Sequence, residues 1–464
     1  MTTDLRPYPE YKDSGLPWLG QIPAHWDEKR AKYYFREVDE RSSTGEERLM
    51  SVSHVTGVTP RKQNVTMFMA ESNVGHKLCR PGDLVINTMW AWMAAMGVAR
   101  ETGLVSPSYG VYRPREDAEY SPDYVDHLLR TQPYASEYLC RSTGIRASRL
   151  RLYPDDFLDI RVVHPPLEEQ EAMVRFIAHH DRLIRRFIRN RRRLIEVLNE
   201  QKQAIINRAV TGQIDIRTGK PYPRYKPSGI DWLGDIPEHW ALLSLRRVAQ
   251  SLDGQRIPLN AEQRGRMLGP YPYWGANTII DHVDRWLFDE ELVLLGEDGA
   301  PFFDRGRDVA FFVTGKVWVN NHAHVLRPRG VDPRFLTHVL NCVDYAEYVG
   351  GATRDKLTQH AMKAIPIQLP PVDEQSRICQ HILAALHPIE AAASRAKREI
   401  DLIREYRTRL IADVVTGKLD VRGFASALDK EPAETEDAWE GIDDEQLLGD
   451  EEPELAEEAS DADD

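Results

Sequence analysis

PPLEEQEAMVRFIAHHDRLIRRFIRNRRRLIEVLNEQKQAIINRAVTGQIDIR, residues 165–217, is the stretch around which the rest of this sequence is organised. Both of its ends recur. PPLEEQ returns as PPVDEQ at residues 370–375, and AVTGQIDIR returns as VVTGKLDVR at residues 414–422. Both ends are displaced by 205 residues, so no gap separates the two copies. An ungapped span with matching ends indicates one rigid element that is present twice.

A second repeated stretch lies upstream of each copy. YKDSGLPWLGQIPAHW (residues 11–26) returns as YKPSGIDWLGDIPEHW (residues 225–240), with 11 of 16 positions identical. This leader pair is displaced by 214 residues, so the segments that follow the two leaders differ in length, and they also differ in sequence. The repeated stretches are similar connectors, and the segments between them are two dissimilar inserts. This arrangement predicts a bipartite architecture.

The segment that follows PPLEEQ has apolar residues at helical spacing and no Pro or Gly before Gly212. Its second copy has one interruption, Pro388, which should bend or restart the helix. Both predicted helices end at a Thr-Gly pair, as a glycine C-cap requires. About 44 residues at 1.5 Å each give a rod of about 66 Å. Two such amphipathic rods favour an antiparallel coiled coil with an insert domain at either end. The alternative is two separate helices, each covering its own domain.

The inserts, about 27–164 and 241–369, have the pattern of α+β domains, with short apolar runs between turn residues. The expected strands are at 82–89 and 110–114 in the first insert and at 291–300, 308–313 and 315–328 in the second. Helical stretches follow near 122–139 and 333–349. The predicted fold class is therefore α+β, with two α+β domains separated by two long helices. The expected segments are domain 1 (1–164), helix 1 (165–218), domain 2 (219–369), helix 2 (370–423) and an acidic tail (424–464).

Composition narrows the class of protein. A chain of 464 residues is too long for one core. No apolar run is long enough to cross a bilayer, and the polar N-terminus lacks the apolar region of a secretory signal. The four cysteines lie far apart without a CxxC pair, which argues against a disulfide framework or a zinc site. The expected location is the cytoplasm, with no membrane partner.

The net charge of −13 is unevenly distributed. From Phe424 onward there are 18 Asp or Glu against one basic residue, Lys430, so this tail carries −17 and residues 1–423 carry +4. A tail of this composition is expected to be disordered. It is either a solubilising appendage or a competitor for the basic surface of the body.

The repeated motifs resemble the specificity subunit of Type I restriction–modification enzymes, the HsdS family. The matching features are the two SGxxWLGxIPxHW leaders, the two PPxxEQ helix starts and the two VTGxxDxR helix ends. Within the inserts, GDLVINTMWAW (82–92), SPSYGVYRP (106–114), YPYWGANTIID (271–281), VNNHAHVLRP (319–328) and GATRDKL (351–357) also resemble target recognition domains of that family. The resemblance covers nearly everything from Tyr11 to Arg422, and the acidic tail lies outside it.

The resemblance implies a subunit without catalytic residues of its own. Each insert would be a target recognition domain that reads one half of a split sequence in double-stranded DNA. The helices would set the length of the unread spacer and seat two methyltransferase subunits. S-adenosylmethionine is expected on those partner subunits and no cofactor on this chain. Restriction subunits that translocate and cut DNA would join through them.

Two other classes of function were weighed against this one. The first is an internally duplicated nuclease or methyltransferase. No phosphate-binding loop, GxGxxG or Asn-Pro-Pro-aromatic motif is present to support it. Carboxylates at Asp155, Asp156, Glu297 and Asp298 suggest a metal site only weakly. His322 and His324 should share one face of a strand, more as core or hydrogen-bonded histidines than as metal ligands. The second alternative, a purely structural scaffold, leaves the unlike inserts unexplained.

The candidate DNA-binding residues are polar or aromatic side chains in the loops of the inserts, of the types that reach base edges and phosphates. For each of them taken singly, the role of a structural loop residue is favoured over a base contact. The candidates of the first insert are Asn87, Thr88, Trp90, Ser106, Ser108, Tyr109, Arg146, Ser148 and Arg149. The candidates of the second insert are Trp274, Asn277, Asn320, Asn321, His322, Arg354 and Lys356.

Two further groups of side chains have different expected roles. The leader tryptophans Trp18, Trp26, Trp232 and Trp240 are expected to pack the domains onto the helices, because two unlike targets would not share one reader. The arginines of the first helix at 185–193 have no equal in the second helix. They form either a solvated face or a contact to spacer phosphates.

Overall fold

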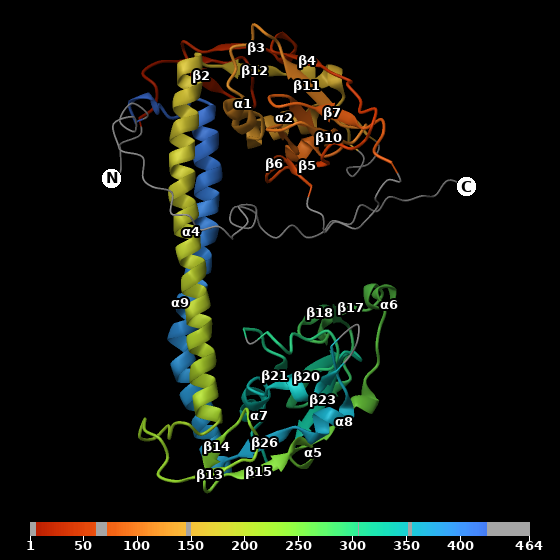
Figure 1. Ribbon diagram of the computed structural model, residues 1–464, viewed down its shortest axis with the longest axis vertical. Coiled ribbons are helices and arrows are strands. Elements are labelled where there is room, and N and C mark those ends of the chain that lie inside the picture. Colours follow the sequence, from red (N-terminus) through yellow and green to blue (C-terminus); the bar gives the residue numbers. More distant parts are fainter. Residues whose placement is uncertain (1–5, 62–71, 145–149, 305, 351–354, 425–464) are drawn as a thin grey trace, which may run out of the picture. The chain divides into compact units, whose positions relative to one another are not determined.

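The computed structural model describes residues 6–61, 72–144, 150–304, 306–350 and 355–424. The chain divides into two compact units. Unit 1 combines Met1–Arg191 with Arg398–Asp464, and unit 2 is Arg192–Lys397. Each unit therefore contains one insert and parts of both long helices, α4 (Leu167–Val210) and α9 (Val372–Val415) (Figure 1).

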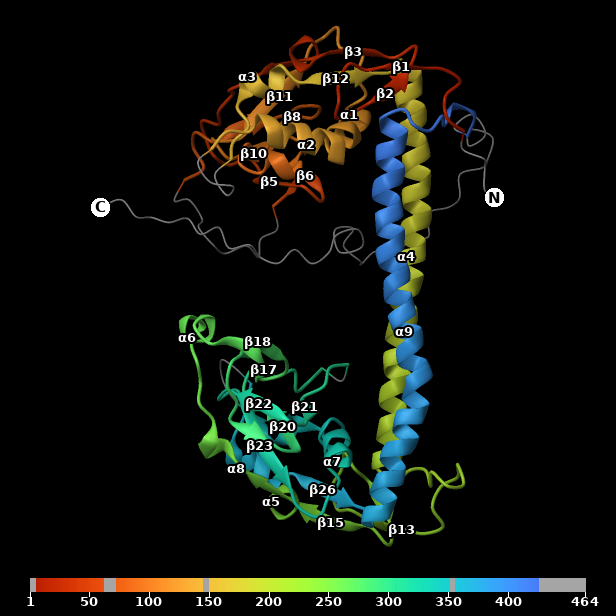
Figure 2. The same ribbon diagram turned by 180° about the vertical axis from the view of Figure 1, so that it is seen from behind.

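The two long helices confirm the predicted pair, and each is 44 residues long. Within unit 1, the start of α4 lies beside the end of α9, because Arg407 binds Asp181 at 2.8 Å and Arg191 binds Glu399 at 2.6 Å. Within unit 2, Lys202 near the end of α4 lies 3.4 Å from Glu390 near the start of α9. These pairs run in opposite directions along the two helices, so the coiled coil is antiparallel, as both views show (Figure 2).

Of the two expected effects of Pro388, a restart of the second helix does not occur, and a bend stays a prediction. α9 continues as one α-helix through Pro388. A proline inside a helix removes one backbone hydrogen bond. Next to it, Leu386 and Ile389 are buried in the core of unit 2, and that packing compensates for the lost bond. The Thr-Gly helix ends match the prediction, since Gly212 and Gly417 follow the helices with φ values of 73° and 81°.

Unit 1 is built on a four-stranded antiparallel sheet in the order β4-β11-β8-β9. These strands are Phe35–Glu37, Gly110–Pro114, Leu84–Ile86 and Met96–Val98. Helices α1 (Pro122–Leu129), α2 (Gln132–Arg141) and α3 (Pro154–Leu158) complete its core. The remaining strands are β1 (Tyr11–Asp13), β2 (Gln21–Pro23), β3 (Asp27–Arg30), β5 (Met50–Ser53), β6 (Gly57–Pro60), β7 (Lys77–Cys79), β10 (Gly103–Val105) and β12 (Arg161–His164).

Unit 2 has a four-stranded antiparallel sheet in the order β16-β23-β20-β21. These strands are Ala249–Ser251, Ala323–Pro328, Leu292–Gly296 and Ala310–Val313. The other strands are β13 (Tyr225–Pro227), β14 (Asp235–Pro237), β15 (Ala241–Ser244), β17 (Leu268–Trp274), β18 (Ile279–Val283), β19 (Phe288–Asp289), β22 (Lys316–Val319), β24 (Val349–Gly350), β25 (Lys356–Leu357) and β26 (Pro366–Leu369). Its short helices are α5 (Leu245–Val248), α6 (Ala261–Gly265), α7 (Pro333–Leu340) and α8 (Gln359–Ala364).

The two central sheets share one topology although their sequences are unlike. Along the chain, β4, β8, β9 and β11 correspond in order to β16, β20, β21 and β23. The frame around each sheet corresponds too, since the strand after each leader pairs with the strand before each long helix, β3 with β12 and β15 with β26. A second four-stranded sheet, β18-β17-β22-β19, belongs to unit 2, whereas unit 1 has the separate pairs β5–β6 and β7–β10.

The leaders attach each insert to the helices, which explains why they are repeated. Glu169, at the start of α4, accepts hydrogen bonds from Trp26 Nε1 at 3.0 Å and from the hydroxyl of Tyr8 at 3.2 Å. Glu374, at the start of α9, does the same for Trp240 at 3.2 Å and Tyr222 at 2.6 Å. Burial and these carboxylates raise the pKa of both tyrosines far above the usual range. The repeated Glu is therefore a buried anchor for its leader.

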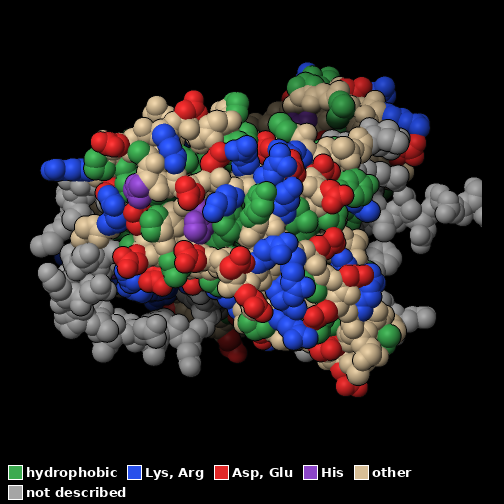
Figure 3. Space-filling view, turned by 90° about the horizontal axis from the view of Figure 1, so that it is seen from above, with side chains coloured by type: hydrophobic (Ala, Val, Ile, Leu, Met, Phe, Trp, Pro, Cys, Tyr) green, Lys and Arg blue, Asp and Glu red, His purple; other side chains and the backbone are tan. Residues whose placement is uncertain are grey.

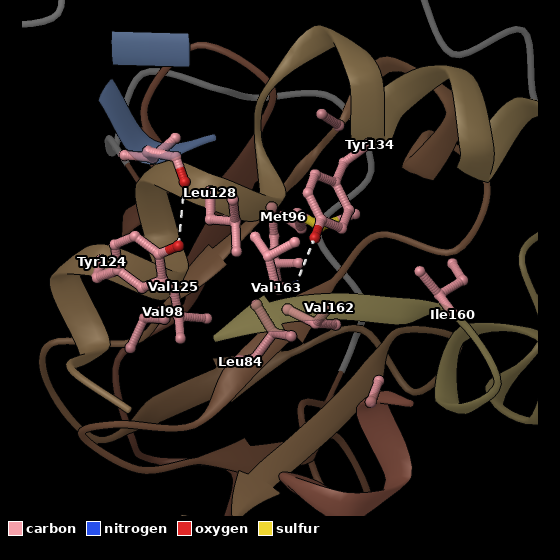
Figure 4. Packing of buried hydrophobic residues seen from close by; sticks show 14 of the residues in the cluster. Leu84, Met96, Val98, Tyr124, Val125, Leu128, Tyr134, Ile160, Val162 and Val163 are labelled. Carbon is pink, nitrogen blue, oxygen red and sulfur yellow. Dashed lines mark hydrogen bonds between the residues drawn. The ribbon is translucent and has the colours of Figure 1, made fainter. Parts of the chain in front are cut away.

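The helix ends complete the same junctions. A Cβ at Gly417 would lie 2.4 Å from Pro23, and one at Gly212 would lie 2.4 Å from Pro237. In unit 1, the hydroxyl of Tyr124 also donates to the carbonyl oxygen of Val415 at 3.0 Å (Figure 4). Hydrogen bonds and packing thus hold the first insert against the start of α4 and the end of α9. The predicted packing role of Trp26 and Trp240 is confirmed by their complete burial.

Candidate nucleic-acid interface

In unit 1, the predicted DNA-binding residues gather at one edge of the central sheet. Asn87 and Thr88 directly follow β8, and Ser108 and Tyr109 directly precede its neighbour β11. Asn87 Nδ2 donates to the hydroxyl of Tyr109 at 3.0 Å, and the hydroxyl of Thr88 donates to the carbonyl oxygen of Ser108 at 2.9 Å. The hydroxyls of Ser106 and Ser108 lie 2.9 Å apart. Five of the candidates are therefore one connected cluster.

The same edge carries two more features. Trp90 stacks on Trp92 with ring centroids 6.1 Å apart, in the turn that follows Thr88. The backbone N–H of Leu152 donates to the carbonyl oxygen of Thr88 at 2.9 Å, and Thr143 pairs with Arg151 in an isolated bridge. The candidates Arg146, Ser148 and Arg149 lie outside the described residues.

In unit 2, the candidates occupy the corresponding edge. Glu297 and Asp298 directly follow β20, and Asn321 and His322 directly precede β23. The backbone N–H of Glu297 donates to the carbonyl oxygen of His322 at 2.8 Å, and His322 Nδ1 bonds to Asp298 Oδ1. Asn320 is buried, and its side-chain oxygen accepts from the backbone N–H of His322 at 2.8 Å.

Trp274 contacts residues next to this edge. Its carbonyl oxygen accepts from the backbone N–H of Asn320 at 3.1 Å, and its ring packs on Phe311. A hollow of about 530 Å³ opens beside the edge and is lined by Pro258, Leu259, Asn260, Gln263, Arg264, Tyr273, Ile280, Asn320, Asn321 and His322. Lys356 binds Glu297 at 3.3 Å. Asn277 follows β17, and among the described residues its side chain makes no hydrogen bond to the other candidates. Arg354 lies outside the described residues.

The two edges correspond residue by residue along the segment that leads to each long helix. The backbone N–H of Leu357 donates to Glu297 at 2.7 Å, as that of Leu152 donates to Thr88. Leu152 and Leu357 are 205 residues apart, which is the displacement of the repeated helices. The ungapped correspondence therefore extends upstream of PPLEEQ to the edge itself. Counting back from these leucines aligns Arg149 with Arg354, a relation that the displacement could have indicated from sequence.

At the unit 2 edge, acidic and basic side chains form ion pairs with each other. Glu297 lies between Arg256 at 2.7 Å and Lys356 at 3.3 Å. Behind it, His324 binds Asp253 at 2.8 Å and is fully buried. Burial alone would raise the pKa of Asp253, but the bonds from His324 and from the backbone of Val325 hold it well below its usual range. Arg256 and Glu297 were not predicted as interface residues, because nothing in the sequence showed that they would meet.

The expectation that His322 and His324 share a face of one strand is wrong. β23 begins at Ala323, so His322 belongs to the turn before it and binds Asp298, whereas His324 points into the core. Of the carboxylates considered for a metal, Asp155 and Asp156 belong to unit 1 and Glu297 and Asp298 to unit 2. Within the described residues, no group of three or more His, Cys, Asp or Glu could hold a metal ion. No helix there is long and apolar enough to cross a membrane.

Basic side chains are also present outside these edges. Figure 3 shows one face of the molecule on which Lys and Arg side chains gather in patches, with Asp and Glu interspersed (Figure 3). Such a surface can contact phosphates without selecting a sequence.

Comparison with known proteins finds similarity in part of the sequence and in the fold. Residues 237–397 match the model of the Type I restriction modification DNA specificity domain. A solved structure described under complex assembly and conformational transition of the type I restriction–modification system has a TM-score of 0.55 at 18% identity, covering 86% of this chain and 99% of that one. Part of this chain is thus similar in sequence to specificity subunits of type I restriction enzymes, and its fold is similar to that of a solved chain from such a system.

Two named relatives extend the match. A chain named as a type I restriction enzyme specificity subunit of Haemophilus influenzae is 35% identical over 143 residues, which is 31% of this chain and 36% of that relative. A chain of Methanocaldococcus jannaschii, named as the MjaX specificity subunit, is 24% identical over 334 residues, covering 67% of this chain and 71% of its own length.

Proposed function

We propose that this chain is the DNA-specificity subunit of a Type I restriction–modification complex and that each unit reads one half of a bipartite DNA target. The observation that carries the proposal is the shared sheet edge. The same topology presents Asn87, Thr88 and Tyr109 in unit 1 but Glu297, Asp298 and His322 in unit 2. One scaffold with different polar side chains at one place is what reading two unlike half-sites requires.

The chemistry of the unit 1 edge fits base recognition. Asn87 donates to Tyr109, and its buried side-chain oxygen has no hydrogen-bond partner within the described residues. An amide with one donor and one acceptor can pair with adenine along a base edge. Ser108 is exposed beside it and can donate or accept.

The remaining partners are proposals that rest on the family. Two methyltransferase subunits would dock on this chain and bring S-adenosylmethionine, and restriction subunits would join through them in the cytoplasm. The continuous helices α4 and α9 would set the number of unread base pairs between the half-sites. The identity of the recognised bases follows from neither the fold nor the family.

Substitutions at the two edges test this proposal. In the assembled methyltransferase complex, Ser108→Ala and Asn87→Ala should relax the sequence requirement at one or two positions of one half-site, and Asn321→Ala should do so in the other. A lost base contact is worth about 1–3 kcal/mol, or about 5- to 150-fold in discrimination. Sequencing of methylated positions in a randomised DNA library measures it.

Ser136→Ala is the matched control, because Ser136 is a half-buried serine of α2 whose hydroxyl donates to the carbonyl oxygen of Gln132 within its own helix. It should leave both half-sites unchanged. Equal loss of discrimination in both half-sites after a single-unit substitution would contradict the proposal, and so would a uniform loss of affinity with unchanged sequence preference.

A further inference from the structure

A row of three arginines runs along one face of α4 in unit 1. Arg182, Arg186 and Arg189 follow one another by four and three residues, which places them on one face of the helix. Ile177, Ile184 and Ile188 are buried, and at 100° per residue they lie on the opposite face of the helix. The arginine row therefore points away from the packed side of α4.

These three arginines differ from their neighbours in lacking acidic partners. Arg191 binds Glu399 at 2.6 Å and Arg407 binds Asp181 at 2.8 Å. No carboxylate among the described residues forms an ion pair with Arg182, Arg186 or Arg189. Three like charges on consecutive turns repel each other, so an anion that contacts all three would be favoured.

Phe424, the last described residue, packs on α4 just before the first arginine of this row. Its ring packs against Phe176 at 5.1 Å, His179 at 5.6 Å and His180 at 5.5 Å between ring centroids. From His180 to Arg189 is about 14 Å along a helix at 1.5 Å per residue. The chain that continues after Phe424 thus starts within one or two helical turns of the arginines.

We propose that the acidic segment 425–464 docks on the arginine row of Arg182, Arg186 and Arg189 in the same molecule. The segment carries 18 Asp or Glu and one Lys. An extended chain covers about 3.3 Å per residue, so its first ten residues could cover about 33 Å, more than the length of the row. Tethering gives the segment an effective concentration of about millimolar, which favours it over a free polyanion of equal affinity.

Docking has a consequence for nucleic acid. Phosphates and carboxylates compete for guanidinium groups, so the bound segment would exclude DNA phosphates from this face until a duplex displaces it. Docking itself does not rest on the proposed function, because it concerns two parts of this chain only.

Site-specific photo-crosslinking in the full chain tests the inference. With p-benzoylphenylalanine in place of Trp439, irradiation should give crosslinks that map by mass spectrometry to α4 near residues 178–193. Replacing Arg182, Arg186 and Arg189 with Gln should reduce their yield at least fivefold, as should 1 M NaCl. Replacing the same three residues with Lys should retain most of it, because the charge is kept.

The matched control replaces Arg246, Arg247 and Arg285 with Gln; these are exposed arginines of unit 2. It should leave the yield unchanged. Crosslinks spread over other segments, or a yield insensitive to the row substitutions, would overturn the inference. The inference would also be overturned if replacing the three arginines with Gln weakened duplex binding equally in the full chain and in a chain without residues 425–464. The arginines would then contact phosphates alone.

Discussion

Alanine at Gly212 should destabilise unit 2 by about 2–5 kcal/mol, and alanine at Gly417 should do the same to unit 1. Both glycines have positive φ, which costs an alanine about 1–2 kcal/mol. The new Cβ at residue 212 would also lie 2.4 Å from Pro237, and that at residue 417 would lie 2.4 Å from Pro23. Overpacking adds about 1–3 kcal/mol because proline cannot move aside. Denaturant unfolding, with hydrogen exchange to assign the unit, measures the effect.

Gly219→Ala is the matched control for unit 2. Gly219 has a φ of 70°, but a Cβ there would meet nothing within 4 Å. It should cost only the backbone strain, about 1–2 kcal/mol. Equal destabilisation at residues 212 and 219 would mean that the leader does not pack on the helix end as described.

Lengthening both helices together should lengthen the unread spacer of the DNA target. Seven residues inserted after Asn199 in α4, and seven after Ala392 in α9, preserve the heptad phase and add about 10.5 Å at 1.5 Å per residue. At about 3.4 Å per base pair, the preferred spacer should grow by about three base pairs. Selection of bound duplexes with variable spacers measures this shift, and the half-sites should stay the same.

A variant in which seven residues are replaced by the inserted sequence, without added length, serves as the control and should keep the original spacer. An unchanged spacer in the lengthened protein would show that the helices do not set the distance. Loss of all specific binding in both variants would point to damaged helix pairing, which circular dichroism distinguishes.

The long helices were predictable because their signals are local and repeated. Apolar spacing, a Thr-Gly end and an ungapped displacement of 205 residues each depend on sequence alone. Pro388 was the exception, since its tolerance depends on the packing of Leu386 and Ile389 in unit 2. The continuity of the helix at this residue depends on tertiary contacts, which the local sequence pattern does not contain.

The shared topology of the two inserts was not predictable in the same way. Their strands are short, and the residues that line corresponding positions differ, as Tyr109 and His322 do. The prediction nevertheless brought most described candidates to one edge per unit, because glycine and polar turn residues mark the strand ends. Buried partners such as Asp253 and His324 are 71 residues apart, and only the folded sheet brings them together.

The most direct test of the central claim is an exchange of one insert. Residues 27–164 would be replaced by the corresponding insert of one of the similar specificity subunits, and the methylated sequence would be mapped in the assembled complex. The account predicts that one half-site changes while the other half-site and the spacer stay as in the parent. A change in both half-sites, or methylation without a defined sequence, would contradict independent reading by the two units.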